Sequence, residues 1–292
     1  MAMKMDNNNA ATNYDDYLKP INFISTLNGH HGSLIFFGKH DDIDVLYTAY
    51  SNDGRDKSLQ LPFITARVLN NNGFHYVRHE GNECSRIKLE SQDYQFNFIA
   101  GFNYDNFVYF LFMEHHESSN NQQLRLGRLC ENDPHPFFSY MEITLKCNDF
   151  YSSRVAHLSL ALNGDEYLGF KLNSSQEQDA QLLISFNKNS EHDGESLVCQ
   201  FSMAKISEHF LDGFNRCTLN GRGKWLRKLT NYDTVQCKET TFNNKLSGEQ
   251  NQCPYTNANR YIDYDIPLDG QPLINIKKGL NFFQFIRSSN LI

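Results

Sequence analysis

Three adjacent residues of metal-binding type, Glu114, His115 and His116, stand directly after a long apolar run. Imidazole and carboxylate groups are ordinary ligands of zinc and other transition metals. Successive side chains of a strand point to opposite faces of the sheet, however, so neighbours in sequence seldom reach one metal ion. The pattern therefore favours polar residues at the end of a strand, and we predict no metal site here.

Two further stretches contain the residue types of an ion-binding site but lack the flanking elements or key residues that such a site requires. Residues 221–224 read Gly-Arg-Gly-Lys, but the strand and helix that flank a phosphate-binding loop are not predicted around them. His40, Asp41, Asp42 and Asp44 offer ligand atoms, but the glycine and the final glutamate of a calcium loop are missing. No Gly-x-Ser-x-Gly nucleophile motif occurs either. We therefore expect no catalytic residues, no bound metal and no cofactor, and hence no enzyme.

The cysteines fit either an extracellular or a cytosolic protein. There are seven, none in a Cys-x-x-Cys pair, which argues against zinc ribbons and thioredoxin-type sites. Their wide spacing is typical of disulfides in an extracellular domain, but it also fits reduced, buried thiols in the cytosol. An odd number leaves one cysteine without a partner inside the chain. The seven are Cys84, Cys130, Cys147, Cys199, Cys217, Cys237 and Cys253.

Charge and hydropathy exclude some partners. The formal net charge of −7 argues against nucleic acid, which is bound by clustered lysine and arginine. No apolar run reaches the length of a membrane span, and the first residues lack the apolar region of a signal peptide. Taken literally, these features describe a soluble cytoplasmic protein. Together with the cysteines, they suggest a secreted domain whose true start lies upstream.

The stretch Gln95–Cys147 has the clearest secondary structure. Apolar runs at 96–102 and 107–112 flank the turn residues Asn103, Asp105 and Asn106, and two more runs follow at 124–130 and 137–145. Phenylalanine and tyrosine favour strands, and connections this short join antiparallel neighbours. We predict four antiparallel strands in this stretch.

The rest of the chain predicts a similar architecture. Strands are expected at 33–37, 44–50, 62–69, 154–162, 167–172, 182–186, 197–201 and 282–286. Asn163-Gly164 predicts a hairpin that joins 154–162 to 167–172, and Met203–Leu211 is the only predicted helix. Residues 212–279 show no regular pattern. Because strands do not alternate with helices, we predict an all-β fold, with a propeller favoured over a sandwich, for residues 21–292 after a disordered Asn-rich segment at 1–20.

Several of these stretches, in their order and spacing, resemble the sema domain of plexins over roughly residues 30–280. They are the runs Ala100–Phe112, Leu124–Asp133, Ser139–Cys147 and Leu197–Ile206, with Trp225-Leu226 and Gln271–Leu273 further on. The resemblance implies a seven-bladed β-propeller with four-stranded blades. The chain has room for about four to five of them, and we expect it to be incomplete at both ends.

The resemblance also implies a function. The chain would be the extracellular ligand-binding domain of a plexin-like receptor for semaphorins, signalling in cell guidance or adhesion at the plasma membrane. Contact with the membrane would run only through receptor parts outside this chain. The alternatives are a semaphorin-like ligand and a sema domain of the hepatocyte growth factor receptor type. In a secreted glycoprotein, the sequon at Asn173 would carry a glycan.

The cysteine pattern of plexins, carried onto matching positions, implies three disulfides. The pairs are Cys130–Cys253, Cys147–Cys199 and Cys217–Cys237, which leaves Cys84 outside the pattern. No motif marks the residues that would contact a ligand. We expect them among the exposed strand ends and loops of Gln95–Cys147.

Overall fold

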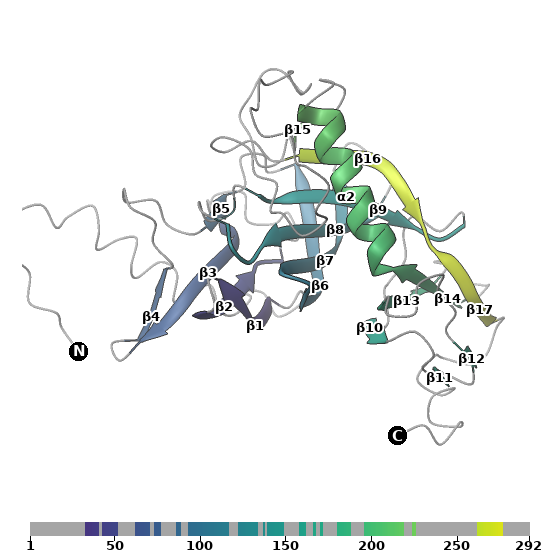
Figure 1. Cartoon of the computed structure of the whole chain (residues 1–292), viewed down its shortest axis with the longest axis horizontal. Helices are drawn as coiled ribbons and strands as arrows, with labels where there is room; N and C mark the ends of the chain where they lie inside the picture. The colour runs from purple at the N-terminus through teal and green to yellow at the C-terminus, as the bar shows by residue number, and fades with distance from the viewer. Residues whose placement is uncertain are drawn as a thin grey trace, which may run out of the picture.

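The structure is a computed structural model whose described residues form three large sheets, a two-stranded hairpin and a long helix (Figure 1). It describes residues 33–40, 43–51, 62–70, 73–76, 86–88, 93–116, 122–133, 137, 139–148, 158–161, 166–167, 170–171, 180–187, 196–218, 224–225 and 262–276. The Asn-rich segment 1–20 and the strand expected at 282–286 lie outside these residues.

Each of the three large sheets has at least four strands. The first sheet contains β1 (Leu34–His40), β2 (Ile43–Ala49), β3 (Pro62–Asn70), β4 (Gly73–Tyr76) and β5 (Arg86–Lys88). The central sheet runs in the order β15 (Lys224–Trp225), β16 (Ile262–Asp269), β9 (Met141–Lys146), β8 (Gln122–Cys130), β7 (Phe107–His116) and β6 (Tyr94–Tyr104). The third sheet runs β10 (Leu158–Ala161), β13 (Gln181–Asn187), β14 (Ser196–Ser202) and β17 (Gln271–Ile276).

The four strands predicted in Gln95–Cys147 are confirmed as the antiparallel series β6 to β9. The first hairpin turns at Asp105 and Asn106, which both adopt positive φ angles, 50° and 63°. Tyr104 pairs with Phe107 to close this two-residue turn. Asp and Asn tolerate the left-handed conformation that such a turn requires, which is why the turn forms at this point.

The last of these strands begins later than expected. β9 starts at Met141, whereas the predicted strand began at Phe137. Phe137 lies in a turn, with φ of 71°. The buried carboxylate of Asp133 accepts hydrogen bonds from the backbone N–H of Ser139 at 2.8 Å and from its hydroxyl at 2.7 Å. These bonds hold the segment before β9 in a turn and keep it from extending the strand.

The hairpin predicted around Asn163-Gly164 is wrong. β10 pairs with β13, with Ser159 opposite Leu183, and does not pair with the strand expected at 167–172. That stretch instead contains a small hairpin of its own, β11 (Glu166–Tyr167) with β12 (Phe170–Lys171). β10 pairs with β13 because pairing is favoured where side chains pack against a buried neighbour, and β13 is buried along Gln181–Phe186.

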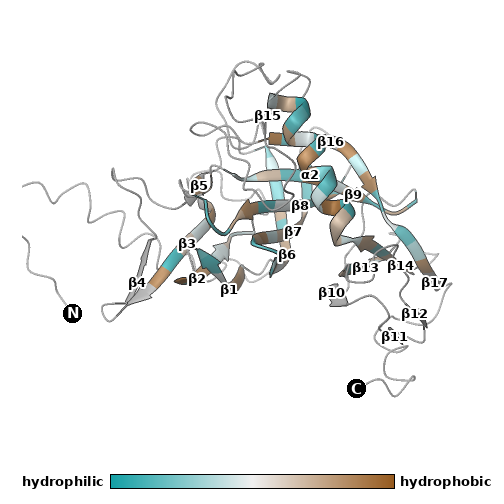
Figure 2. Cartoon of the chain, viewed as in Figure 1, coloured by the Kyte–Doolittle hydropathy of each residue, from teal (hydrophilic) through white to brown (hydrophobic). Residues whose placement is uncertain are grey.

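Residues 212–279, where no pattern was recognised, contribute three strands and half of a helix. The helix α2 (Met203–Thr218) is longer than predicted, and its face of Met203, Ile206, Phe210, Phe214 and Cys217 is buried. In Figure 2 hydrophobic and hydrophilic residues alternate along α2, as expected for a helix with one face on the core. The strands β15, β16 and β17 follow.

The central sheet is buried on both faces. On β7, Tyr109, Leu111 and Met113 face a core shared with the third sheet and α2. Their neighbours Val108 and Phe110 face a second core shared with the first sheet. This explains why the run 107–112 is apolar throughout, without the alternation of a half-exposed strand. Burying each large apolar side chain contributes about 1.5–3 kcal/mol.

Candidate functional site

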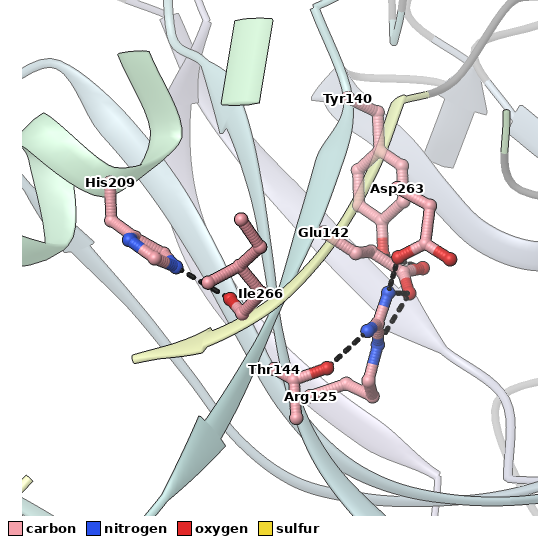
Figure 3. A network of polar contacts seen from close by, with 7 residues as sticks. All are labelled: Arg125, Tyr140, Glu142, Thr144, His209, Asp263 and Ile266. Carbon is pink, nitrogen blue, oxygen red and sulfur yellow. Dashed lines mark hydrogen bonds and ion pairs between the residues drawn. The ribbon is translucent and has the colours of Figure 1, made fainter. Parts of the chain in front are cut away.

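A buried charged network connects β8, β9 and β16 (Figure 3). The guanidinium of Arg125 donates to Glu142 Oε2 from Nε at 3.3 Å and from Nη2 at 3.2 Å, and to Thr144 Oγ1 at 2.5 Å. Its Nη2 also donates to the carboxylate of Asp263 on β16. The hydroxyl of Tyr140 donates to the other oxygen of Glu142 at 3.0 Å. Every strand of this corner of the sheet is therefore joined to the next through one guanidinium.

Burial and charge act in opposite directions on this network. Burial alone would lower the pKa of Arg125, but the nearby carboxylates of Asp263, Glu114 and Glu142 raise it above its ordinary value. The side chain of Glu142 is 0% exposed, whereas that of Asp263 is 26% exposed. Burial, together with the negative charge of Glu142, also raises the pKa of Tyr140, which stays a neutral donor. The network thus has one fully buried carboxylate and one at its rim.

A second buried arginine attaches α2 to the central sheet. The guanidinium carbon of Arg128 lies 4.2 Å from the ring centre of Phe107 and 4.2 Å from that of Phe210. Its Nη1 donates to Ser207 Oγ at 3.2 Å. Burial lowers the pKa of Arg128, partly offset by Tyr109. Two aromatic faces stabilise the cation, so the side chain contributes to the packing of the helix on the sheet.

Polar contacts also join α2 to β16. His209 Nε2 lies 2.8 Å from the carbonyl oxygen of Ile266, and its ring lies 4.5 Å from that of Tyr264. The hydroxyl of Tyr264 donates to the carboxylate of Asp212 and accepts from Arg216 Nη1 at 3.3 Å. Helix and strand are therefore fixed to each other at the edge of the sheet as well as through the apolar core.

His209 predicts a pH dependence of stability. Burial lowers its pKa from 6.5, against the opposing effects of the Ile266 carbonyl and Asp212. As the pH falls through 6.5, the unfolded chain binds the proton first, so the folded state loses stability. We expect the loss of unfolding free energy between pH 7.5 and 5.5 to be smaller in His209→Gln than in the wild type. The difference should stay below about 1 kcal/mol because the ring is partly exposed. Urea unfolding at the two pH values measures it, and an equal or larger acid loss in the variant would contradict this role.

The disulfide Cys147–Cys199 is present and links the end of β9 to β14, with 6.4 Å between the Cα atoms. Both cysteines are fully buried. Cys130 and Cys217 are disulfide-bonded as well. Their expected partners, Cys253 and Cys237, lie outside the described residues, as does Cys84, so those two pairings stay predictions.

The polar residues noted first in the sequence contact other parts of the central sheet. Glu114 contributes to the charge around Arg125, and His116 packs its ring 4.5 Å from that of Tyr94. Within the described ranges no three metal-binding side chains come together. Lys224 begins β15, whereas the rest of the 221–224 loop and the sequon at Asn173 lie outside the described residues.

One end of the central sheet is formed by the β6–β7 hairpin turn and by the residues that follow β8. Asp105, Asn106 and Asn132 are exposed there. The N–H of Glu131 donates to the carbonyl of Asn106 at 2.9 Å, which joins the two connections. We call these four residues the hairpin end. Large exposed apolar side chains of the described residues lie elsewhere, at Ile35, Phe37, Ile43 and Ile266.

Sequence reasoning missed the charged network because its members are far apart in the chain. Arg125 and Asp263 are separated by 138 positions. One signal was available, since Ile262, Tyr264 and Ile266 alternate with polar residues, as a half-buried strand requires. An aspartate next to a buried position on such a strand would have suggested a cationic partner.

Comparison with known proteins shows which proteins this chain is similar to. Residues 169–285 match the sema domain family model. Plexin-A4 of Danio rerio is 29% identical over 206 residues, and plexin-A4 of Mus musculus is 28% identical over 213 residues. These matches cover 60% and 64% of this chain but only 10% and 11% of the relatives, so the chain spans about a tenth of their length.

The fold agrees with these relatives. A solved structure of the full plexin A4 extracellular region superimposes with a TM-score of 0.65 at 24% identity, over 84% of this chain and 28% of that one. The three large sheets do not close into a ring within the described residues. No helix of the described part is long and apolar enough to cross a membrane. In sequence the chain is similar to plexin-type sema domains, and its mostly β fold is that of a partial β-propeller.

Proposed function

We propose that this chain is the ligand-recognition module of a plexin-like cell-surface receptor, that it binds a semaphorin through protein–protein contacts, and that it catalyses no reaction. The observation that carries the proposal is the joint similarity in sequence and fold to the plexin-A4 extracellular region. The charged groups of the central sheet support it. Arg125 binds carboxylates of neighbouring strands, and Arg128 packs against α2, so both arginines have structural roles.

We place the contact surface at the hairpin end. Its turns are fixed by backbone hydrogen bonds, and a rigid surface loses little entropy on binding. The exposed side chains there are acidic or amide groups, and Asp105 adds negative charge at the tip. Such a surface fits a partner whose facing patch is basic or rich in hydrogen-bond donors.

A retention experiment tests the function. Immobilised chain is offered purified semaphorin ectodomain and purified plexin ectodomain from the same source. We expect semaphorin to be retained and plexin to pass through. Retention of plexin alone would favour the second candidate, a semaphorin-like ligand, and retention of neither would overturn the proposed recognition role.

A matched pair of variants tests the surface. Asn132→Arg places a cation at the hairpin end, and we expect it to weaken semaphorin binding at least about tenfold through charge and steric mismatch. Gln122→Arg adds the same side chain at the exposed start of β8, at the opposite end of the sheet, and should leave affinity within about twofold. Interferometry gives both constants. Equal affinities for the two variants would move the contact surface away from the hairpin end.

A further inference from the structure

Two consecutive strands near the end of the described chain belong to different sheets. β16 joins the central sheet, where it lies parallel to β9, and β17 joins the third sheet, where it pairs with β14. A single residue, Gly270, separates them. Figure 1 shows the yellow ribbon passing from β9 to β14. We call residues 262–276 the strap, since this one segment crosses the junction between the two sheets.

The strap is fixed at both of its halves. On the central sheet, Asp263 binds Arg125, and Asp269 binds Lys146 at 3.0 Å. The N–H of Gly270 donates to the carbonyl of Lys146 at 2.8 Å. On the third sheet, Gln200 Nε2 donates to Gln271 Oε1 at 2.9 Å beside the ladder between β14 and β17. Each sheet therefore holds the strap by backbone pairing and by side-chain contacts.

The attachment to β9 is interrupted between the two aspartates. The register shifts between Tyr264 and Leu268, on either side of Pro267, which has no N–H to donate. Between these positions the carbonyl of Ile266 is held by His209 of α2. The ion pairs of Asp263 and Asp269 thus fasten the strap at the two points where it meets the ladder.

The disulfide crosses the same junction at the same place. Cys147 follows β9 directly, and Cys199 lies opposite Pro272 of the strap. Lys146, which pairs with Asp269, is the residue next to Cys147. The covalent bond and the backbone of the strap therefore cross the junction side by side, and α2, which continues from β14 and packs on β16, also spans it.

We propose that the strap holds the central and third sheets together independently of the Cys147–Cys199 disulfide. The junction between the sheets therefore stays closed when the disulfide is reduced. While the disulfide is intact, it holds the end of β9 against β14 with or without the contacts of the strap. Once it is reduced, the ion pairs and ladders of the strap keep both thiols buried. This inference does not rest on the proposed semaphorin binding, because it concerns only the junction between the sheets.

The reactivity of the two thiols measures the junction directly. Folded chain is reduced under mild conditions and treated with iodoacetamide, and the labelling of Cys147 and Cys199 is followed by peptide mass spectrometry. Both side chains are 0% exposed in the folded chain. We expect labelling at least about 100-fold slower than in chain unfolded in urea, because it requires opening of the junction. Labelling at the unfolded rate, or loss of the circular dichroism spectrum on reduction, would overturn the proposal.

A variant of the strap extends the labelling experiment. In reduced Asp263→Asn/Asp269→Asn we expect labelling at least about tenfold faster than in the reduced wild type, because two charge-assisted contacts are lost. The same variant with the disulfide intact should keep the wild-type spectrum. Asp44→Asn, which removes the exposed ion pair with Lys39 in the first sheet, serves as the control and should label at the wild-type rate. Equal rates for the strap variant and this control would show that the strap does not fasten the junction.

Discussion

Replacing Arg125 by methionine is expected to lower the free energy of unfolding by about 3–5 kcal/mol. The change removes the guanidinium that pairs with Glu142, whose side chain is 0% exposed. Asp263 loses the same partner at the rim. The cost is that of breaking a buried ion pair, which is larger than that of losing a surface contact. Urea unfolding followed by circular dichroism measures the loss.

Two further variants separate this charge effect from a packing effect. In Arg125→Met/Glu142→Leu the uncompensated carboxylate is gone, so we expect at least half of the lost stability to return. Lys39→Met breaks the ion pair between Lys39 and Asp44, whose side chains are 48% and 75% exposed, and should change stability by less than about 0.5 kcal/mol. A loss below about 1 kcal/mol in Arg125→Met would mean that the network contributes little to the fold.

Removal of the Cys147–Cys199 disulfide has the second large expected effect. The two cysteines are separated by 52 positions, and opening a loop of that size increases the entropy of the unfolded chain. For Cys147→Ala/Cys199→Ala we therefore expect a loss of about 4 kcal/mol at 25 °C. Urea unfolding under oxidising conditions measures it, in comparison with the wild type.

This loss should arise mainly in the unfolded state. If the strap holds the junction, the double variant keeps the native near-ultraviolet circular dichroism spectrum in the absence of urea. Loss of that spectrum would show that the bond also maintains the native packing, and a stability loss below about 1 kcal/mol would contradict the loop-entropy account.

The parts of the fold that could be predicted from the sequence are those with local causes. The meander β6 to β9 follows from apolar runs and from an Asp-Asn turn that accepts positive φ. The start of α2 follows from the spacing of Met203, Ile206 and Phe210. The failures have longer-range causes. The partner of β10 is chosen by the core of the third sheet and not by the nearby Asn163-Gly164.

Two prolines explain why the strands of the strap could not be predicted from the sequence. Pro267 and Pro272 lie inside β16 and β17, and a proline ordinarily argues against a strand. Here Pro267 coincides with a shift of register, and Pro272 lies on β17, at the end of the strand order of its sheet. The parallel pairing of β16 with β9 also joins segments more than a hundred positions apart, which no local pattern encodes. For the same reason, Asp263 could not be recognised as the partner of Arg125.

Disulfide mapping tests the central proposal, that this chain shares the disulfide pattern of plexin-type sema domains, most directly. Folded, oxidised chain is alkylated, digested without reduction and analysed by mass spectrometry. We predict three bridges, Cys147–Cys199 together with Cys130–Cys253 and Cys217–Cys237, and an alkylated Cys84. A free Cys147 in the folded material, or pairings of Cys130 and Cys217 with other partners, would contradict the account.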